Sequence, residues 1–147
     1  MWKLVIADDE RLIVKGLVRM TDWESLDVEV AGVAYDGEQL KKMIEFADPD
    51  IVVTDIMMPY ITGLDLLHWN NEKNGKAKFI FVSGYQEFSY AQEALKNGAV
   101  DYLLKPVARK DLEESVRKAI SVIKKRNTAE IFNEEKDEFQ KLFEEIN

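Results

Sequence analysis

Five short runs of apolar residues alternate with longer segments in which apolar residues recur at helical spacing. The runs lie at residues 4–7, 28–34, 51–54, 79–82 and 102–104. Residues 51–53 and 79–82 are continuously apolar rather than alternating, as expected for strands buried on both faces. Between the runs, apolar side chains recur every three or four positions, as at Leu40, Met43, Ile44 and Ala47. This alternation predicts an α/β fold in which helices cover both faces of a parallel sheet.

Polar side chains directly follow four of these runs. Asp8 and Asp9 follow the first run, Asp55 the third, Ser83 the fourth and Lys105 the fifth. Because the carboxyl ends of parallel strands open on one edge of a sheet, these side chains should converge there. Carboxylates, a hydroxyl and an ammonium at one edge are suited to holding a divalent cation beside a phosphoryl group.

Each of these residues also has a purely structural explanation. An aspartate pair after a strand often caps a helix, and a single aspartate such as Asp55 often belongs to a turn. Ser83 is equally able to cap the next helix, and Lys105-Pro106 is compatible with a solvated loop. One shared site accounts for all four features, in order and each at a strand end, better than four coincidences do. The pattern therefore favours a phosphoacceptor site.

In four motifs the chain resembles the receiver domain of two-component response regulators. The motifs are Ala7-Asp8-Asp9-Glu10, Thr54-Asp55-Ile56-Met57-Met58-Pro59 with Gly63, Ser83-Gly84, and Lys105-Pro106. The resemblance covers residues 1–123 and implies a flavodoxin-like (βα)5 three-layer sandwich with parallel strand order 2-1-3-4-5. Two further stretches, Thr21-Asp22-Trp23 and residues 83–91, look like the receivers that precede an AraC-type DNA-binding domain.

The resemblance implies a role for each site residue. Asp55 accepts a phosphoryl group from a histidine kinase, so the chain catalyses only its own phosphorylation and slow dephosphorylation. Asp9, Asp55 and the backbone carbonyl of Met57 ligate Mg²⁺, while Asp8 acts largely through water. Lys105 contacts a phosphoryl oxygen. These roles agree with the nucleophilicity of carboxylates toward phosphorus and with the preference of Mg²⁺ for oxygen ligands.

The resemblance also implies how phosphorylation is transmitted. Ser83 bonds a phosphoryl oxygen, the ring of Tyr102 moves inward, and the surface of the fourth helix, fifth strand and fifth helix changes its associations. By itself, Tyr102 is equally compatible with a half-buried tyrosine at a sheet edge. In such receivers the Lys105-Pro106 peptide bond is cis. Met57 and Tyr85 border the path of the attacking water, so slow hydrolysis of the phosphoaspartate is expected.

Composition narrows the function further. The 147 residues suit one domain with an extension, and the absence of cysteine excludes disulfides and thiolate metal sites. The net charge of -8 argues against direct binding of nucleic acid, so DNA contact is expected from a separate output domain. No signal-like or membrane-spanning segment is apparent, so a cytoplasmic location is expected. The only histidine, His68, is expected at the surface or core edge.

Residues 124–147 are expected to form a helical extension toward an output domain outside this chain. Residues 126–147 carry three basic and seven acidic side chains, a formal charge of -4. The large apolar residues there are Ile131, Phe132, Phe139, Leu142, Phe143 and Ile146. At ~100° per residue they fall within an arc of about 120°, as in an amphipathic helix, and point away from the stripe of the preceding helix. We expect a homodimer through this extension and through the fourth helix, fifth strand and fifth helix; the simpler alternative is a solvated tail.

Two other functions share parts of this residue set. A phosphatase of the haloacid dehalogenase type also uses Asp, Ser or Thr, Lys and Mg²⁺. It needs a second Asp two residues after the nucleophile, however, where this chain has Met57. A pseudo-receiver that acts only as a docking module has no need of the acidic pair, the acceptor and the lysine together. The sequence therefore predicts a phosphoacceptor receiver that controls an output domain.

Overall fold

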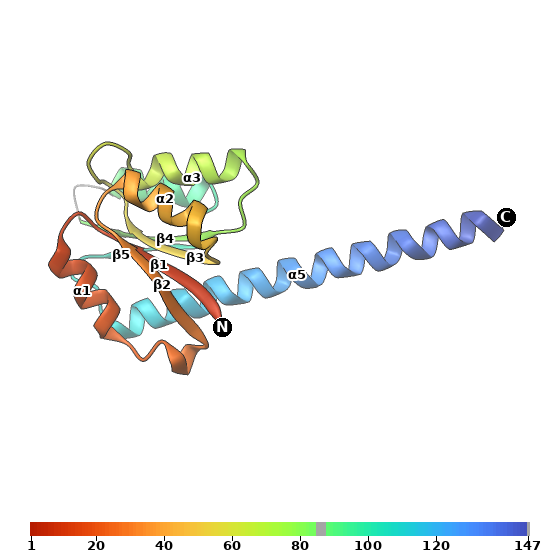
Figure 1. Ribbon diagram of the computed structural model, residues 1–147, viewed down its shortest axis with the longest axis horizontal. Helices are drawn as coiled ribbons and strands as arrows, with labels where there is room; N and C mark the ends of the chain where they lie inside the picture. Colours follow the sequence, from red (N-terminus) through yellow and green to blue (C-terminus); the bar gives the residue numbers. More distant parts are fainter. Residues whose placement is uncertain (85–87, 147) are drawn as a thin grey trace.

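The computed structural model, which describes residues 1–84 and 88–146, is a three-layer α/β sandwich with one projecting helix (Figure 1). Its elements are β1 (Trp2–Ala7), α1 (Arg11–Met20), the short 3-10 helix η1 (Glu24–Leu26), β2 (Val28–Ala34), α2 (Gly37–Ala47), β3 (Ile51–Asp55), α3 (Gly63–Glu72), β4 (Lys78–Ser83), α4 (Phe88–Lys96), β5 (Asp101–Leu104) and α5 (Arg109–Ile146). The sheet has five parallel strands in the order β2-β1-β3-β4-β5. The predicted fold class and strand order are confirmed.

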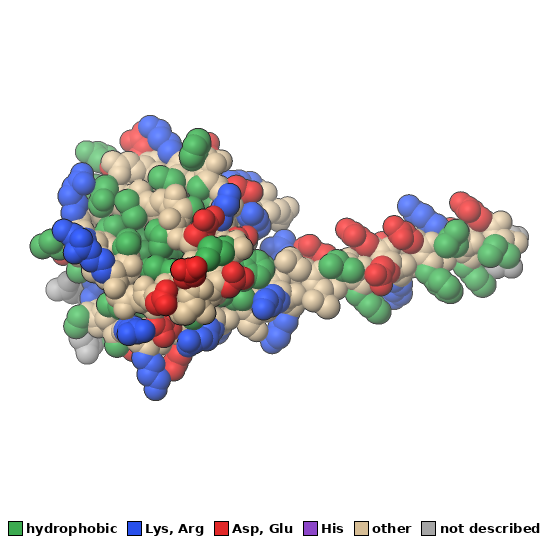
Figure 2. All heavy atoms as spheres, turned by 60° about the horizontal axis from the view of Figure 1, so that its bottom comes forward, with side chains coloured by type: hydrophobic (Ala, Val, Ile, Leu, Met, Phe, Trp, Pro, Cys, Tyr) green, Lys and Arg blue, Asp and Glu red, His purple; other side chains and the backbone are tan. Residues whose placement is uncertain are grey.

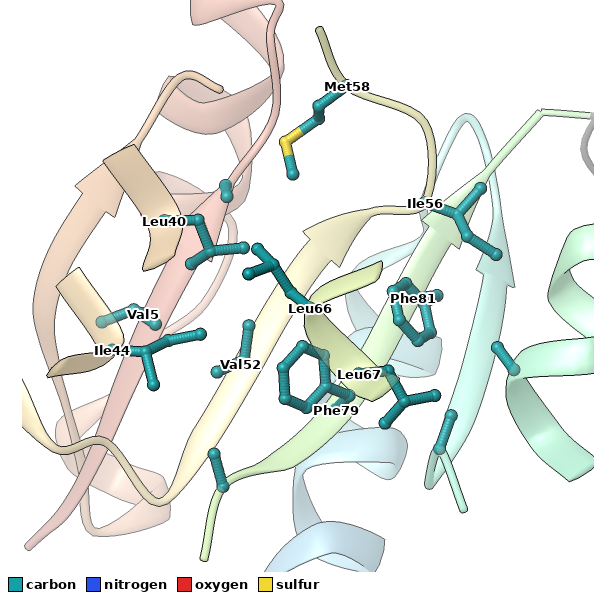
Figure 3. Packing of buried hydrophobic residues seen from close by; sticks show 14 of the residues in the cluster. Val5, Leu40, Ile44, Val52, Ile56, Met58, Leu66, Leu67, Phe79 and Phe81 are labelled. Carbon is teal, nitrogen blue, oxygen red and sulfur yellow. The ribbon is translucent and has the colours of Figure 1, made fainter. Parts of the chain in front are cut away.

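The two faces of the sheet pack against different helices, because successive side chains of a strand point to opposite sides. On one face, Val5, Val52 and Phe79 pack against α2, α3 and α4 (Figure 3). On the other face, Leu4 and Val53 pack against α1 and the first part of α5. Every residue of β3 is buried, which explains why residues 51–53 are continuously apolar.

The loop between β3 and α3 folds tightly back onto the end of β3. Thr62 and Asp65 form a capping box, in which each backbone N–H donates to the side chain of the other residue. The N–H of Gly63 donates to the carbonyl oxygen of Ile56 at 2.9 Å. A Cβ atom at Gly63 would lie only 2.4 Å from the carbonyl oxygen of Asp55. Glycine is therefore required for this close approach, which holds the loop beside Asp55.

α5 is one continuous helix of 38 residues, and only its first part packs on the sheet. Its buried side chains are Leu112, Ser115, Val116, Ala119 and Ile123. Beyond Ile123 the helix runs outward from the globular part, and residues 124–146 are all exposed (Figure 1). The expected helical extension is present, and it leaves its apolar side chains in solvent. Within residues 1–84 and 88–146, no helix combines the length and the apolar character needed to cross a membrane.

Candidate functional site

The strands bring the predicted site residues to one edge of the sheet. Asp8 directly follows β1, Asp55 ends β3, Ser83 ends β4 and Lys105 directly follows β5. These four strands are neighbours in parallel register, so their carboxyl ends lie side by side. Residues up to 97 positions apart in the sequence therefore meet at one edge.

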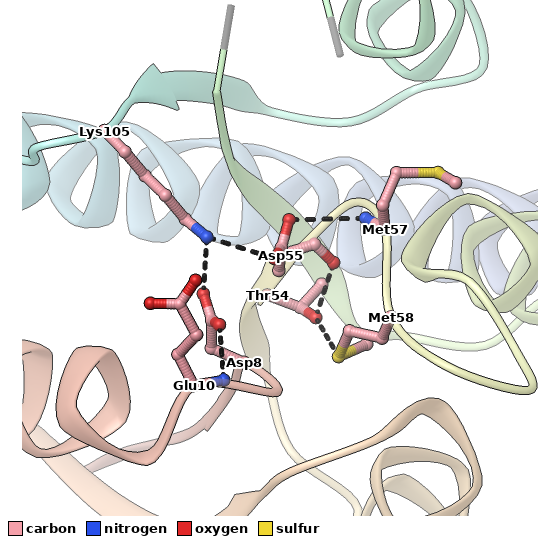
Figure 4. A network of polar contacts seen from close by, with 7 residues as sticks. All are labelled: Asp8, Glu10, Thr54, Asp55, Met57, Met58 and Lys105. Atoms are coloured by element: carbon pink, nitrogen blue, oxygen red, sulfur yellow. Dashed lines mark hydrogen bonds and ion pairs between the residues drawn. The ribbon is translucent and has the colours of Figure 1, made fainter. Parts of the chain in front are cut away.

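The ammonium group of Lys105 bridges two buried carboxylates (Figure 4). Its Nζ lies 2.9 Å from Oδ2 of Asp8 and 3.0 Å from Oδ2 of Asp55. The Asp8 side chain is fully buried and the Asp55 side chain is 5% exposed, whereas that of Lys105 is 23% exposed. The backbone N–H of Lys105 donates to the carbonyl oxygen of Ser83 at 2.9 Å, and the Lys105-Pro106 peptide bond is cis. Lys105 is thus joined to three of the four strands that carry the site.

Three carboxylates form a cluster at this edge that fits a metal ion. One oxygen from each of Asp8, Asp9 and Asp55 lies within 4.8 Å of the others, and Asp9 is the exposed member of the three. All the donors are hard oxygen atoms, the type that Mg²⁺ binds in proteins while keeping several water ligands. An exposed carboxylate beside two buried ones leaves room for such waters. The donor set therefore suits a partly hydrated Mg²⁺ ion.

The electrostatics of the site are dominated by burial and by the contacts of Lys105. Burial raises the pKa of Asp8, and the negative charge of Asp55 acts in the same direction; bonds from the Glu10 backbone and from Lys105 oppose it. Burial also opposes the charged form of Lys105, but the hydrogen bonds and charges of Asp8 and Asp55 outweigh it and raise the pKa of Lys105. The lysine therefore stays cationic, as a partner for phosphoryl oxygens must.

Backbone groups that the sequence reasoning did not identify hold the two buried carboxylates. The backbone N–H of Glu10 donates to Oδ1 of Asp8 at 2.9 Å, and that of Met57 donates to Oδ1 of Asp55 at 3.3 Å. In both cases the donor lies two residues after the aspartate. This is the spacing of an Asx-turn, and it is the signal in the sequence from which both hydrogen bonds could have been predicted. The hydroxyl of Thr54 donates to the carbonyl oxygen of Asp55 at 2.9 Å.

The two expected switch residues have distinct environments. The Oγ atom of Ser83 is buried and, among the described residues, has no hydrogen-bond partner. A buried hydroxyl without a partner is costly, so Ser83 is suited to bond a group that enters the site. Tyr102 is half-buried in β5, and its ring meets that of Phe88 edge to face with centroids 6.2 Å apart. The described contacts of Tyr102 also fit the simpler half-buried alternative.

The remaining residues singled out from the sequence have structural surroundings. Trp23 packs among core residues on the α1 side of the sheet, and its indole N–H donates to the carbonyl oxygen of Val18 at 2.8 Å. Thr21 bonds Glu113 and so connects the end of α1 to α5. His68 is half-buried in α3. Tyr85, expected near the path of the attacking water, lies outside the described residues.

A family model for the response regulator receiver domain matches residues 4–117. The uncharacterized transcriptional regulatory protein YesN of Bacillus subtilis is 37% identical over 127 residues, which are 86% of this chain and 34% of that protein. The transcriptional regulatory protein HptR of Staphylococcus aureus is 37% identical over 113 residues, 77% of this chain and 44% of that protein. The chain thus spans less than half the length of these curated relatives.

Solved structures agree with this match. The receiver domain of AraT, a response regulator from Geobacillus stearothermophilus, is 36% identical with a TM-score of 0.78, and the similarity covers 85% of this chain and 98% of that one. A response regulator receiver domain protein from Clostridium thermocellum is 29% identical with a TM-score of 0.74, covering 84% and 98% of the two chains. The chain therefore belongs to the response regulator receiver domain family.

Proposed function

We propose that Asp55 accepts a phosphoryl group from a sensor histidine kinase in a Mg²⁺-dependent reaction. The observation that carries this proposal is the position of the Lys105 ammonium, 2.9 Å from Asp8 and 3.0 Å from Asp55. A fixed cation beside a buried carboxylate is the arrangement that transfer of a charged phosphoryl group requires, because such catalysis is mostly positioning and neutralisation.

In the proposed reaction, a carboxylate oxygen of Asp55 attacks the phosphorus of a phosphohistidine on the kinase. A P–O bond forms, the P–N bond breaks, and the released imidazole takes up a proton. Bound by Asp8, Asp9, Asp55 and the Met57 carbonyl, Mg²⁺ would supply positive charge to the phosphoryl oxygens. Lys105 neutralises a further oxygen, and the N–H of Met57 holds the acceptor carboxylate in place.

The same site supplies a switch. Once Asp55 carries a phosphoryl group, the hydroxyl of Ser83, which has no hydrogen-bond partner in residues 1–84 and 88–146, gains an acceptor, and this draws the end of β4 toward the site. The half-buried ring of Tyr102 on the neighbouring strand follows, which changes the surface formed by α4, β5 and α5. Two relatives are named transcriptional regulatory proteins and are longer than this chain, so we place a DNA-binding output domain in the complete protein.

The projecting part of α5 provides the second element of the proposal, a homodimer. Its six large apolar side chains, at positions 131, 132, 139, 142, 143 and 146, are each 57% exposed or more. An exposed apolar stripe of this size usually marks a partner site. We place the dimer contact on this stripe, with the surface formed by α4, β5 and α5 favouring association after phosphorylation.

Intact-mass measurement after incubation with acetyl phosphate and Mg²⁺ tests the acceptor function. The expected result is a gain of one phosphate that fails to form in EDTA and is lost on mild base treatment, as for an acyl phosphate. A pseudo-receiver would gain no mass. A phosphatase of the haloacid dehalogenase type would instead release many phosphates per chain, and either result would overturn the proposal.

A further inference from the structure

Thr54 places a hydroxyl in a mainly apolar layer of the core. Its side chain is fully buried and, because side chains alternate along a strand, lies on the same face of the sheet as Val52. That face packs against α2 and α3 in a cluster of apolar residues that includes Met58 (Figure 3). A buried hydroxyl costs free energy unless it is hydrogen-bonded, and valine has nearly the same shape without that cost. Packing alone therefore does not explain a threonine at this position.

The hydroxyl of Thr54 contacts the chain on both sides of Met57 (Figure 4). It donates to the carbonyl oxygen of Asp55 at 2.9 Å, and its oxygen atom lies 3.7 Å from Sδ of Met58. A hydroxyl has a single proton, and the carbonyl oxygen is both the nearer and the stronger of the two acceptors. Thr54 thus holds both ends of the segment that we call the ligand loop, residues 55–58.

Backbone hydrogen bonds hold the middle of the ligand loop. The N–H of Met57 donates to Oδ1 of Asp55 at 3.3 Å, and the N–H of Gly63 donates to the carbonyl oxygen of Ile56 at 2.9 Å. Together with the contacts of Thr54, these bonds constrain every residue of the ligand loop. The loop is therefore fixed before any cation arrives.

A fixed ligand loop matters because of the ligands that it carries. Asp55 belongs to the carboxylate cluster, and in the proposed function Met57 adds its backbone carbonyl. A carbonyl has no rotamers, so its direction depends on the conformation of the loop. Mg²⁺ demands nearly ideal octahedral geometry, whereas Ca²⁺ accepts irregular arrangements of oxygen ligands. Loosening the loop should therefore penalise Mg²⁺ more than Ca²⁺.

We infer that Thr54 is a positioning residue that sets the preference of the site for Mg²⁺ over Ca²⁺. Its hydroxyl acts through Asp55 and Met58 rather than by contact with the cation. This inference rests on the Mg²⁺ site of the proposed function and adds the residue behind that site which determines the cation that it prefers.

Calorimetric titrations of the full chain with Mg²⁺ and, separately, with Ca²⁺ test this role. Thr54→Val keeps the shape of the side chain and removes the hydroxyl. The net contribution of one hydrogen bond corresponds to roughly a fivefold change in affinity, so the Kd for Mg²⁺ should rise by about that factor. The Kd for Ca²⁺ should stay nearly unchanged. Thr54→Ser keeps the hydroxyl and should retain the wild-type ratio of the two Kd values.

A purely structural role of Thr54 predicts a different pattern. Urea unfolding in EDTA measures the stability of each variant, and a structural role would change this stability while leaving both Kd values unchanged or weakening both equally. A role of the methyl group would make Thr54→Ser, rather than Thr54→Val, lose the preference for Mg²⁺. Each of these results would overturn the inference. If Thr54→Val does not fold, Thr54→Cys takes its place with the same expectation, because a thiol is only a weak donor.

Thr128 offers a matched control. Its hydroxyl also donates to a backbone carbonyl oxygen, that of Lys124, at 2.9 Å. It lies on the projecting part of α5, which extends away from the globular part (Figure 2). Thr128→Val should therefore change neither Kd, and a shift equal to that of Thr54→Val would overturn the inference.

The outcomes also separate this inference from the proposed function. Wild-type protein that binds no Mg²⁺, or that gains phosphate equally well in EDTA, contradicts the Mg²⁺ dependence proposed for Asp55. Wild-type protein that binds Mg²⁺ and gains phosphate, together with a Thr54→Val variant that keeps the full preference for Mg²⁺, overturns the role of Thr54 alone.

Discussion

Replacing Lys105 by methionine should reveal how far the ammonium substitutes for a metal ion. The change keeps the length and packing of the side chain and removes its charge. In the protein as described, that charge lies between the buried carboxylates of Asp8 and Asp55, at 2.9 and 3.0 Å. The same carboxylates belong to the cluster that fits Mg²⁺. The lysine therefore stabilises the metal-free site and at the same time repels the incoming cation.

Two effects of opposite sign follow. Leaving one member of a buried ion pair without its partner costs about 3–5 kcal/mol. Lys105 is 23% exposed, so solvent screens part of this cost and we expect a loss of about 2 kcal/mol in EDTA. An ammonium group and a divalent cation about 5 Å apart repel by about 1.7 kcal/mol even in bulk water. Removing the ammonium should therefore tighten Mg²⁺ binding by about tenfold or more.

Calorimetric titration with Mg²⁺ and urea unfolding, with and without the metal, measure both effects. When both proteins are unfolded at the same Mg²⁺ concentration, well above either Kd, a tenfold tighter Kd raises the free energy of unfolding of the variant by about 1.4 kcal/mol more than that of the wild type. Lys15→Met, on the exposed side of α1, controls for the loss of one positive charge far from the site. If Lys105→Met bound Mg²⁺ as weakly as the wild type or more weakly, the ammonium would not compete with the metal, and this reasoning would fail.

Three further changes have defined outcomes. Asp9→Ala should weaken Mg²⁺ binding more than Asp8→Ala if Asp9 is the direct ligand, and calorimetric titration showing the reverse order would exchange their roles. The hydrogen bond from Thr21, with the neighbouring arginines, lowers the pKa of Glu113 below its ordinary value of 4.5. The ionised Glu113 therefore stabilises the folded state above pH 4.5, and this stabilisation is lost as the pH falls through the pKa of the folded state. Glu113→Gln should therefore lower the melting temperature at pH 7, and this deficit should shrink as the pH falls from 4.5 through the lowered pKa of Glu113. A deficit that stays the same as the pH falls would contradict this. Met57→Asn should shorten the phosphate lifetime measured by intact mass if the exposed methionine borders the path of the attacking water, as the resemblance implies, and an unchanged lifetime would remove that role.

Hydrophobic patterning was sufficient to predict the fold because the central strands β1, β3 and β4 are buried on both faces over most of their length. The predicted strand at 28–34 coincides with β2, and the apolar run at 79–82 lies inside β4. The site residues were predictable for a related reason: in a parallel sheet, a position directly after a strand is a position at the carboxyl edge. The helical extension followed from a stripe that points away from the buried stripe of α5, and its side chains are exposed as that geometry requires.

Other features depend on distances that sequence spacing does not encode. Lys105 was expected to contact a phosphoryl oxygen. In the absence of a phosphoryl group it instead bridges Asp8 and Asp55, a contact that forms only because the ends of three strands meet. Its partners are 97 and 50 positions away along the chain. The hydrogen bond between Thr21 and Glu113 likewise cannot be predicted from neighbouring residues in the sequence, because it joins the end of α1 to a residue of α5 that lies 92 positions later. These contacts follow from the assembled sheet rather than from any motif.

Locating the phosphate tests the acceptor role of Asp55 most directly. The protein is incubated with acetyl phosphate and Mg²⁺, the acyl phosphate is reduced with borohydride, and the digested peptides are sequenced by mass spectrometry. Reduction converts the phosphorylated aspartate to homoserine, which should appear at position 55 alone and be absent from Asp55→Asn. Homoserine at Asp8 or Asp9, or equal phosphate gain by Asp55→Asn, would contradict the assignment.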